Sequence, residues 1–376
     1  MAESSSFAEC VQQLHNEFRA YDRTVDLVSC WEFYFTKAEP VPSNTLCFDR
    51  FPRLTPHPEN GSTKKTPDFA ALLSNQYGLV GEIKAGFPRD EKSFLTHLSK
   101  LKKYDCPLAF RSGSHNETAI PSTHDILLMV PYRDAQEIVN RIAQKLSEGA
   151  IQFERSLVVF EWVYDSDRDE YVFRKVAGQP RDFNDSAVPQ EARLSAHFSQ
   201  RGATLKISPD KIKTIKATWQ FCNDAPPDIF TLVFLWTKIF YHLLDPTQRE
   251  NWRRRDPNKQ LPLDLTIGEL TREIETRYPL RWGHWSDWCR SALDTLVAAG
   301  LARRFDKERY IVGFRNLVRE LSEPGHSSVG KDVHRIHEYE RILATYICRG
   351  KTSASEKAIP TEVQGRLFPT TKPSAS

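Results

Sequence analysis

The sequence predicts an α/β domain followed by a smaller α+β domain, and three observations lead to this expectation. Residues 7–150 alternate between helical and strand-like segments in the order helix, strands, helix, strand, helix, which is typical of α/β folds. Residues 227–320 contain three helical segments and then two short strand-like runs. A chain of 376 residues also exceeds the size at which one hydrophobic core usually stops growing, so we expect two domains.

The first domain begins with an amphipathic helix, because apolar residues recur at helical spacing from Phe7 to Phe18 and Ser6 is a suitable N-cap. The apolar run 25–35 could continue this helix. Apolar patterns and turn residues then predict strands at 45–51, 68–73 and 77–85, a helix at 90–104, a strand at 126–130, a helix at 133–146 and a hairpin at 157–176.

The second domain has helical patterns at 229–244, 266–278 and 285–299, followed by short strands at 301–305 and 309–314. With "LTIGELTREI" as second helix and "WCRSALDTLVAAGLARRFDKERYIVGF" as third helix and hairpin, it resembles the winged helix-turn-helix family. The resemblance implies a third helix that enters a DNA major groove, with Arg303 and Arg304 near phosphates. Such modules also serve dimerisation or docking, so a homodimer stays open, and Asp287 and Asp294 in the third helix speak against DNA contact.

Three consecutive arginines, Arg253, Arg254 and Arg255, lie in a predicted loop and could contact a nucleic-acid backbone or simply solvate the loop. Residues 201–320 carry 21 Lys/Arg against 15 Asp/Glu, whereas residues 1–200 carry 23 against 28. This asymmetry is compatible with a phosphate-facing second domain and equally with an ordinary solvated surface.

These patterns set the expected limits of the domains. We expect a first domain at 1–176, an irregular linker at 177–226, the second domain at 227–320, a helix at 321–348 and a disordered tail at 349–376. In the tail, Gln364–Phe368 resembles the Gln-x-x-Leu-Phe peptide by which bacterial replication and repair proteins dock on the sliding clamp, although so short a match also arises by chance.

Other features limit the class of protein. Seven scattered cysteines without a CxxC pair argue against structural zinc and against a disulfide framework. The N-terminus lacks the basic and apolar regions of a secretory signal, and the most apolar stretch, 229–244, is shorter than the roughly 20 residues that span a bilayer. We expect a soluble, cytoplasmic protein without membrane contact.

A group of charged residues within Thr66–Gly86 indicates chemistry. Side chains alternate along a strand, so Glu82 and Lys84 point the same way, about 7 Å apart along the chain. Asp68 belongs to the preceding strand of the predicted hairpin. Carboxylates on neighbouring strands are hard oxygen ligands suited to Mg²⁺ or Mn²⁺, and a nearby lysine can orient water or stabilise developing negative charge.

Pro67 and Asp68, followed after thirteen residues by Glu82, Ile83 and Lys84, resemble the PD-(D/E)XK nuclease superfamily. The resemblance implies a restriction-endonuclease-like αβββαβ core with a mixed sheet, in which Asp68 and Glu82 bind the metal and Lys84 assists catalysis. It also implies a further acid on the first helix, for which Glu17 is the candidate. Lys100 and Tyr104 are placed to face the phosphate on the helix after the Glu-x-Lys strand.

The predicted function is therefore a Mg²⁺- or Mn²⁺-dependent nuclease that hydrolyses DNA, in genome defence, restriction or repair, and endonuclease or exonuclease action stays open. Two alternatives stay open. Glu82 and Lys84 could form a surface ion pair of little energetic weight. The chain could also be a catalytically inactive DNA-binding or assembly protein that acts through its winged helix.

Overall fold

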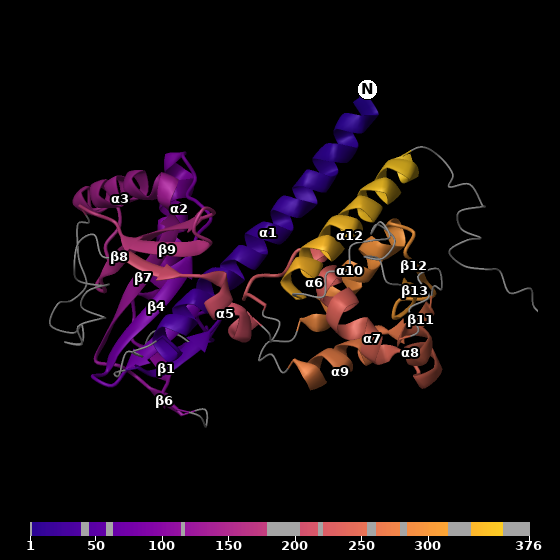
Figure 1. Cartoon of the computed structure of the whole chain (residues 1–376). Coiled ribbons are helices and arrows are strands. Elements are labelled where there is room, and N and C mark those ends of the chain that lie inside the picture. Colours follow the sequence, from indigo (N-terminus) through magenta and orange to yellow (C-terminus); the bar gives the residue numbers. More distant parts are fainter. Residues whose placement is uncertain are drawn as a thin grey trace, which may run out of the picture. The chain divides into compact units, whose positions relative to one another are not determined.

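The computed structural model describes residues 2–38, 45–57, 63–113, 117–178, 204–216, 221–253, 261–278, 284–314 and 332–355. The chain divides into two compact units (Figure 1). The central unit comprises Arg23–Asp224, and the terminal unit combines Met1–Asp22 with Ala225–Ser376. The predicted first domain at 1–176 differs from the central unit at both ends, because the first 22 residues belong with the C-terminal part of the chain and the unit continues to Asp224. The predicted start of the second domain at 227 is close to Ala225.

The first helix, α1, is continuous over Ala2–Thr36 and supplies residues to both units. The predicted helix at 7–18 and the apolar run at 25–35 are parts of this single element. No glycine or proline interrupts the 35 residues, so nothing in the local sequence ends the helix earlier.

The central unit contains a seven-stranded mixed sheet with the order β1-β3-β4-β7-β8-β9-β10. β4 pairs with β7, and β7 with β8, in parallel, whereas the other neighbours are antiparallel. The strands are β1 (Thr45–Arg50), β3 (Phe69–Leu73), β4 (Tyr77–Ile83), β7 (Thr123–Pro131), β8 (Leu157–Asp165), β9 (Glu170–Lys175) and β10 (Thr204–Ile207). The sheet confirms the predicted α/β class, but β10 and the helix α5 (Pro209–Lys216) lie where a linker was predicted.

Helices cover both faces of this sheet (Figure 1). α2 (Glu91–Leu101), the short 3₁₀ turn η2 (Lys102–Tyr104) and α3 (Tyr132–Ser147) bury their apolar sides on one face. The second half of α1 packs on the other face, where the Trp31 ring stacks on Phe69 at 5.8 Å. A small sheet of β2 (Thr55–Pro56), β5 (Leu108–Arg111) and β6 (Thr118–Ala119) completes the unit.

The terminal unit combines helices with a three-stranded antiparallel sheet of order β11-β13-β12. Its core includes Trp285, which is 1% exposed and stacks on Phe234. Its elements are α6 (Asp228–Phe234), a π-helical turn η3 (Leu235–Ile239), α7 (Phe240–Leu243), α8 (Pro246–Arg253), β11 (Leu261–Thr266), α9 (Ile267–Arg277), α10 (Trp285–Ala298), β12 (Ala302–Arg304), β13 (Arg309–Phe314) and α12 (Asp332–Ser355).

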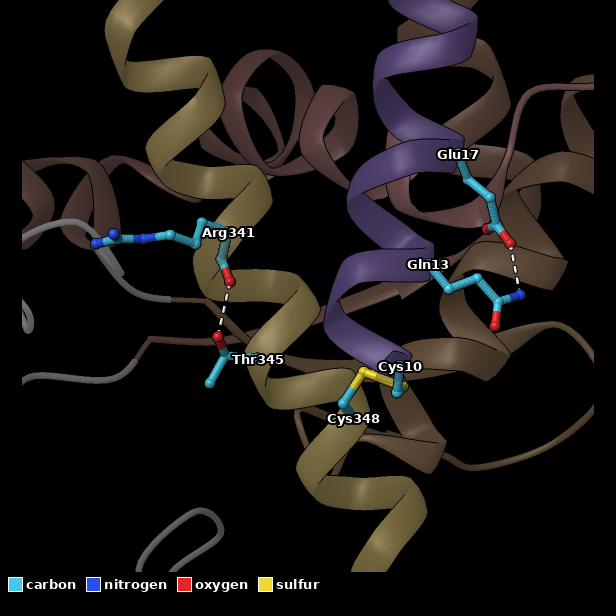
Figure 2. The surroundings of a disulfide bond; sticks show 6 residues. All are labelled: Cys10, Gln13, Glu17, Arg341, Thr345 and Cys348. Carbon is cyan, nitrogen blue, oxygen red and sulfur yellow. Dashed lines mark hydrogen bonds between the residues drawn. A yellow bond between two sulfur atoms is a disulfide. The ribbon is translucent and has the colours of Figure 1, made fainter. Parts of the chain in front are cut away.

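A disulfide joins Cys10 on α1 to Cys348 on α12, with the Cα atoms 5.9 Å apart (Figure 2). The sequence argued against a disulfide framework and did not predict this single bond. The two residues are separated by 338 positions, and they meet because both ends of the chain build the terminal unit. A 2.9 Å ion pair between His15 and Glu340 joins the same two helices.

Two further expectations concern the end of the chain and the membrane. α12 continues to Ser355, so the predicted disordered tail starts within a helix, and Gln364–Phe368 lies outside the described residues. Within the described parts of the chain, no helix is both long and apolar enough to cross a membrane.

Candidate active site

The strands β3 and β4 bring the two predicted acids opposite each other. Phe69 pairs with Gly81, and the Asp68 amide donates to the Gly81 carbonyl at 2.9 Å, so Asp68 faces Glu82 across the two strands. The Asp68 carboxylate also accepts a 2.7 Å hydrogen bond from the backbone of Ile83. This bond fixes one carboxylate oxygen at the end of β4, where the Glu-x-Lys sequence lies.

Gly81 leaves room for the ring of Phe69, its partner on the neighbouring strand. A Cβ atom on Gly81 would lie 2.1 Å from a ring carbon of Phe69, far inside van der Waals contact. The ring therefore occupies the space of the absent side chain on the α1 face of β4. Glu82 and Lys84 point to the opposite face, as alternation along the strand predicted.

Glu82 is the centre of a polar cluster in the central unit. Its side chain is buried, with one carboxylate oxygen 2.7 Å from the Lys84 ammonium and 3.9 Å from that of Lys103. The other oxygen accepts a 2.6 Å hydrogen bond from the Tyr104 hydroxyl. The contact between Glu82 and Lys84 is thus part of a partly buried cluster rather than an exposed surface pair.

His124 forms a hydrogen bond with the backbone of Tyr104. The His124 ring nitrogen Nε2 lies 2.8 Å from the Tyr104 carbonyl oxygen. Burial lowers the pKa of His124 to about 4, so the ring is neutral near pH 7 and donates through Nε2–H. Burial and the Glu82 charge raise the pKa of Tyr104 well above its usual value, so its hydroxyl keeps its proton and donates to Glu82.

The carboxylates influence one another electrostatically. Burial, with the added repulsion of Glu82, raises the pKa of Asp68 from 3.8 to about 8. Burial lowers the pKa of Lys84, but the Glu82 carboxylate outweighs this and the pKa is raised overall, so Lys84 stays charged. A cation between the two acids would relieve their repulsion, which is the behaviour expected of a metal-binding pair.

The two residues expected to face the phosphate from the helix after β4, Lys100 and Tyr104, lie in different surroundings. Tyr104 is fully buried and donates its hydroxyl to Glu82. Lys100 lies exposed on α2, and Lys103 lies 3.9 Å from Glu82.

The remaining predicted site residues belong to the terminal unit. Glu17 accepts a 2.9 Å hydrogen bond from Gln13 on α1 (Figure 2). Arg304 pairs with Asp294 at 3.2 Å, and Arg303 is exposed on β12. The predicted loop arginines begin at the end of α8 with Arg253, and Arg254 and Arg255 lie outside the described residues.

The donor set suits a hard divalent ion with few protein ligands. Among the described residues, no three His, Cys, Asp or Glu side chains are grouped closely enough to hold a metal together. Mg²⁺ is commonly held by one or two carboxylates, with waters and substrate phosphates in its other positions. Asp68 and Glu82 fit that mode of binding.

No family model, curated protein or solved structure matches the chain.

Proposed function

We propose that the protein is a metal-dependent nuclease that hydrolyses DNA phosphodiester bonds at the Asp68–Glu82 pair. The observation that carries this proposal is the facing arrangement of the two carboxylates, with the Lys84 ammonium 2.7 Å from Glu82. Genome defence, restriction or repair are the settings in which such an activity would act.

The residues of the site have separate roles in this proposal. Asp68 and Glu82 would hold Mg²⁺ or Mn²⁺, which when bound acidifies a water and offsets charge on phosphorus. Lys84 orients the attacking water or stabilises the additional negative charge of the transition state. Tyr104 keeps the Glu82 carboxylate in place through its hydroxyl. Lys103 adds a second positive charge beside the same carboxylate.

The order of elements supports the same reading. α1, the strands β1, β3 and β4, then α2 and β7 follow the αβββαβ order that the PD-(D/E)XK resemblance implies. In the terminal unit, α9, α10 and the β12–β13 hairpin follow the order of a winged helix. We propose that this unit binds DNA or a protein partner, with the sliding clamp and a second copy of the chain as candidates.

The charge on the β12–β13 hairpin favours docking over tight phosphate binding. Arg304 pairs with Asp294, and Arg309 contacts Asp264 at 2.5 Å. These acids neutralise arginines that a DNA-binding wing would direct at phosphates. The alternative function, a catalytically inactive binding protein, would tolerate substitution of Asp68 and Glu82.

The test is cleavage of linear, circular and single-stranded DNA by the purified full chain with Mg²⁺ or Mn²⁺. Lys84→Ala should reduce the rate by roughly 10²–10³-fold, the usual effect of removing a group that stabilises transition-state charge. Lys92→Ala, which changes an exposed lysine on α2, is the matched control and should cleave at the wild-type rate. Equal cleavage by all three proteins would refute this site, and binding without cleavage would favour the alternative.

A further inference from the structure

The last residues of the central unit lie beside the candidate site. The Asn223 side chain donates a 2.7 Å hydrogen bond to the Pro67 carbonyl, across 156 positions of sequence. Phe221 and Cys222, just before it, are buried, with 3% and 4% of their surfaces exposed. Core packing and this hydrogen bond therefore fix the segment 221–224 next to the start of β3.

This attachment brings a further acid to the site. The hydrogen bond joins Asn223 to Pro67, and the residues that follow these two are Asp224 and Asp68. Because consecutive Cα atoms are only about 3.8 Å apart, the bond brings the two acids into the same region. The charge of Asp224 reaches three groups of the cluster. Burial is the strongest influence on the pKa values of these groups: it raises those of Asp68 and Tyr104 and lowers that of Lys84, while the Asp224 charge raises all three.

The charges of the cluster agree with binding of a divalent cation. Three carboxylates (Asp68, Glu82 and Asp224) stand against two ammonium groups (Lys84 and Lys103), which leaves one excess negative charge when all are ionised. A divalent cation would change the sum from −1 to +1 and make the site attractive to a phosphodiester.

We propose that Asp224 is a positioning residue of this metal site, which holds a metal-bound water in place instead of touching the ion. The proposal rests on the proposed function. Asp68, Glu82 and Asp224 do not form a group close enough to bind one ion directly, so a water between Asp224 and the ion fits the geometry. Mg²⁺ usually keeps several of its waters, and residues that orient ligands from behind change metal affinity by roughly 10–100-fold.

The experiment is calorimetric titration of the full chain with Mn²⁺ in the absence of nucleic acid. Asp68→Asn should abolish binding, and Asp224→Asn should weaken it by roughly 10–100-fold. Asp210→Asn, which changes an exposed acid on α5 of the same unit, is the matched control and should bind as the wild type does. Asn223→Ala should weaken binding in the same direction, because it releases the segment that carries Asp224.

The outcomes separate the two proposals. Loss of binding in Asp68→Asn with wild-type binding in Asp224→Asn would overturn the role of Asp224 and leave the nuclease site standing. Absence of Mn²⁺ binding by the wild type, or unchanged binding in Asp68→Asn, would overturn both. Water-proton relaxation of the Mn²⁺ complex counts the waters bound to the ion and so tests the bridging water. If Asp224 positions a water, Asp224→Asn should leave the number of bound waters unchanged. If Asp224 were a direct ligand, the variant would bind an additional water in its place, which would overturn the positioning role.

Discussion

Replacing Asp68 by asparagine should stabilise the metal-free protein above neutral pH. Two carboxylates that face each other without a cation repel, and burial with the charge of Glu82 raises the pKa of Asp68 from 3.8 to about 8. Asparagine removes the charge and can still accept the 2.7 Å hydrogen bond from Ile83. A residue selected to bind a metal is expected to destabilise the empty fold in this way.

The sign and size of the effect follow from proton linkage. The folded state holds the Asp68 proton more tightly than the unfolded state does, so the stability that protonation provides is fully present below pH 4. It is lost as the pH rises from 4 to 8. Each pKa unit corresponds to about 1.4 kcal/mol. Because the carboxylate is only half-buried and water screens part of the repulsion, we expect about 1–3 kcal/mol above pH 8.

Thermal unfolding in EDTA between pH 4 and 9 measures this difference. The melting temperatures of wild type and Asp68→Asn should be close at pH 4 and should diverge in favour of the variant as the pH rises, by on the order of 5 °C. Excess Mn²⁺ should then stabilise the wild type and leave the variant unchanged. A variant that is less stable than the wild type at pH 8 in EDTA would refute the electrostatic reasoning.

Three further changes test particular contacts. Tyr104→Phe removes the 2.6 Å donor to the buried carboxylate and should weaken Mn²⁺ binding by roughly 10-fold or more in calorimetry. Cys10→Ser opens the bridge to Cys348 and should lower the free energy of unfolding of the terminal unit by about 2–4 kcal/mol in denaturant titration; a reducing agent should then have no further effect. Gly81→Ala should cost at least about 1–3 kcal/mol on the same measurement, because its Cβ would overlap the Phe69 ring. Wild-type values in any of the three would contradict the contact concerned.

The sequence predicts elements well where a local pattern is long enough to define them. α2 and α3 show helical spacing, and β4 and β7 are apolar runs between turn residues. β10 has only four residues. It forms its hydrogen bonds with β9, a strand that lies earlier in the chain and is not adjacent to it in sequence. Such pairing leaves no local signal, so the sequence alone predicts a linker in this region.

β11 lacks a clear strand signal in the sequence for a different reason. It contains Pro262, which speaks against a strand in the middle of a sheet. The strand lies at one edge of the order β11-β13-β12, where a missing amide donor can face away from its neighbour. The position of a strand within a sheet is a property of the fold, and the sequence pattern alone did not provide it.

The central pair of the candidate site was predictable, because Asp68 and Glu82 lie on the two strands of one hairpin and alternation places Lys84 beside Glu82. The position of the second lysine, Lys103, beside Glu82 was not predictable. Lys100 and Tyr104 are four positions apart, a spacing that puts two residues on one face of an α-helix. The chain here leaves α2 after Leu101 and tightens into the 3₁₀ turn η2. Lys103 belongs to this turn and lies 3.9 Å from Glu82.

Asp224 shows why the remainder of the site needs the fold. No spacing pattern relates a residue to another 156 positions away, and Asn223 has no feature that would mark it as a partner of Pro67. The contact arises because the central unit begins and ends around the same sheet, so its last residues return to the start of β3. If Asp224 positions a metal-bound water, the segment that joins the two units along the chain is also part of the metal site. Changes in that segment should then alter Mn²⁺ affinity while Asp68, Glu82 and Lys84 stay intact.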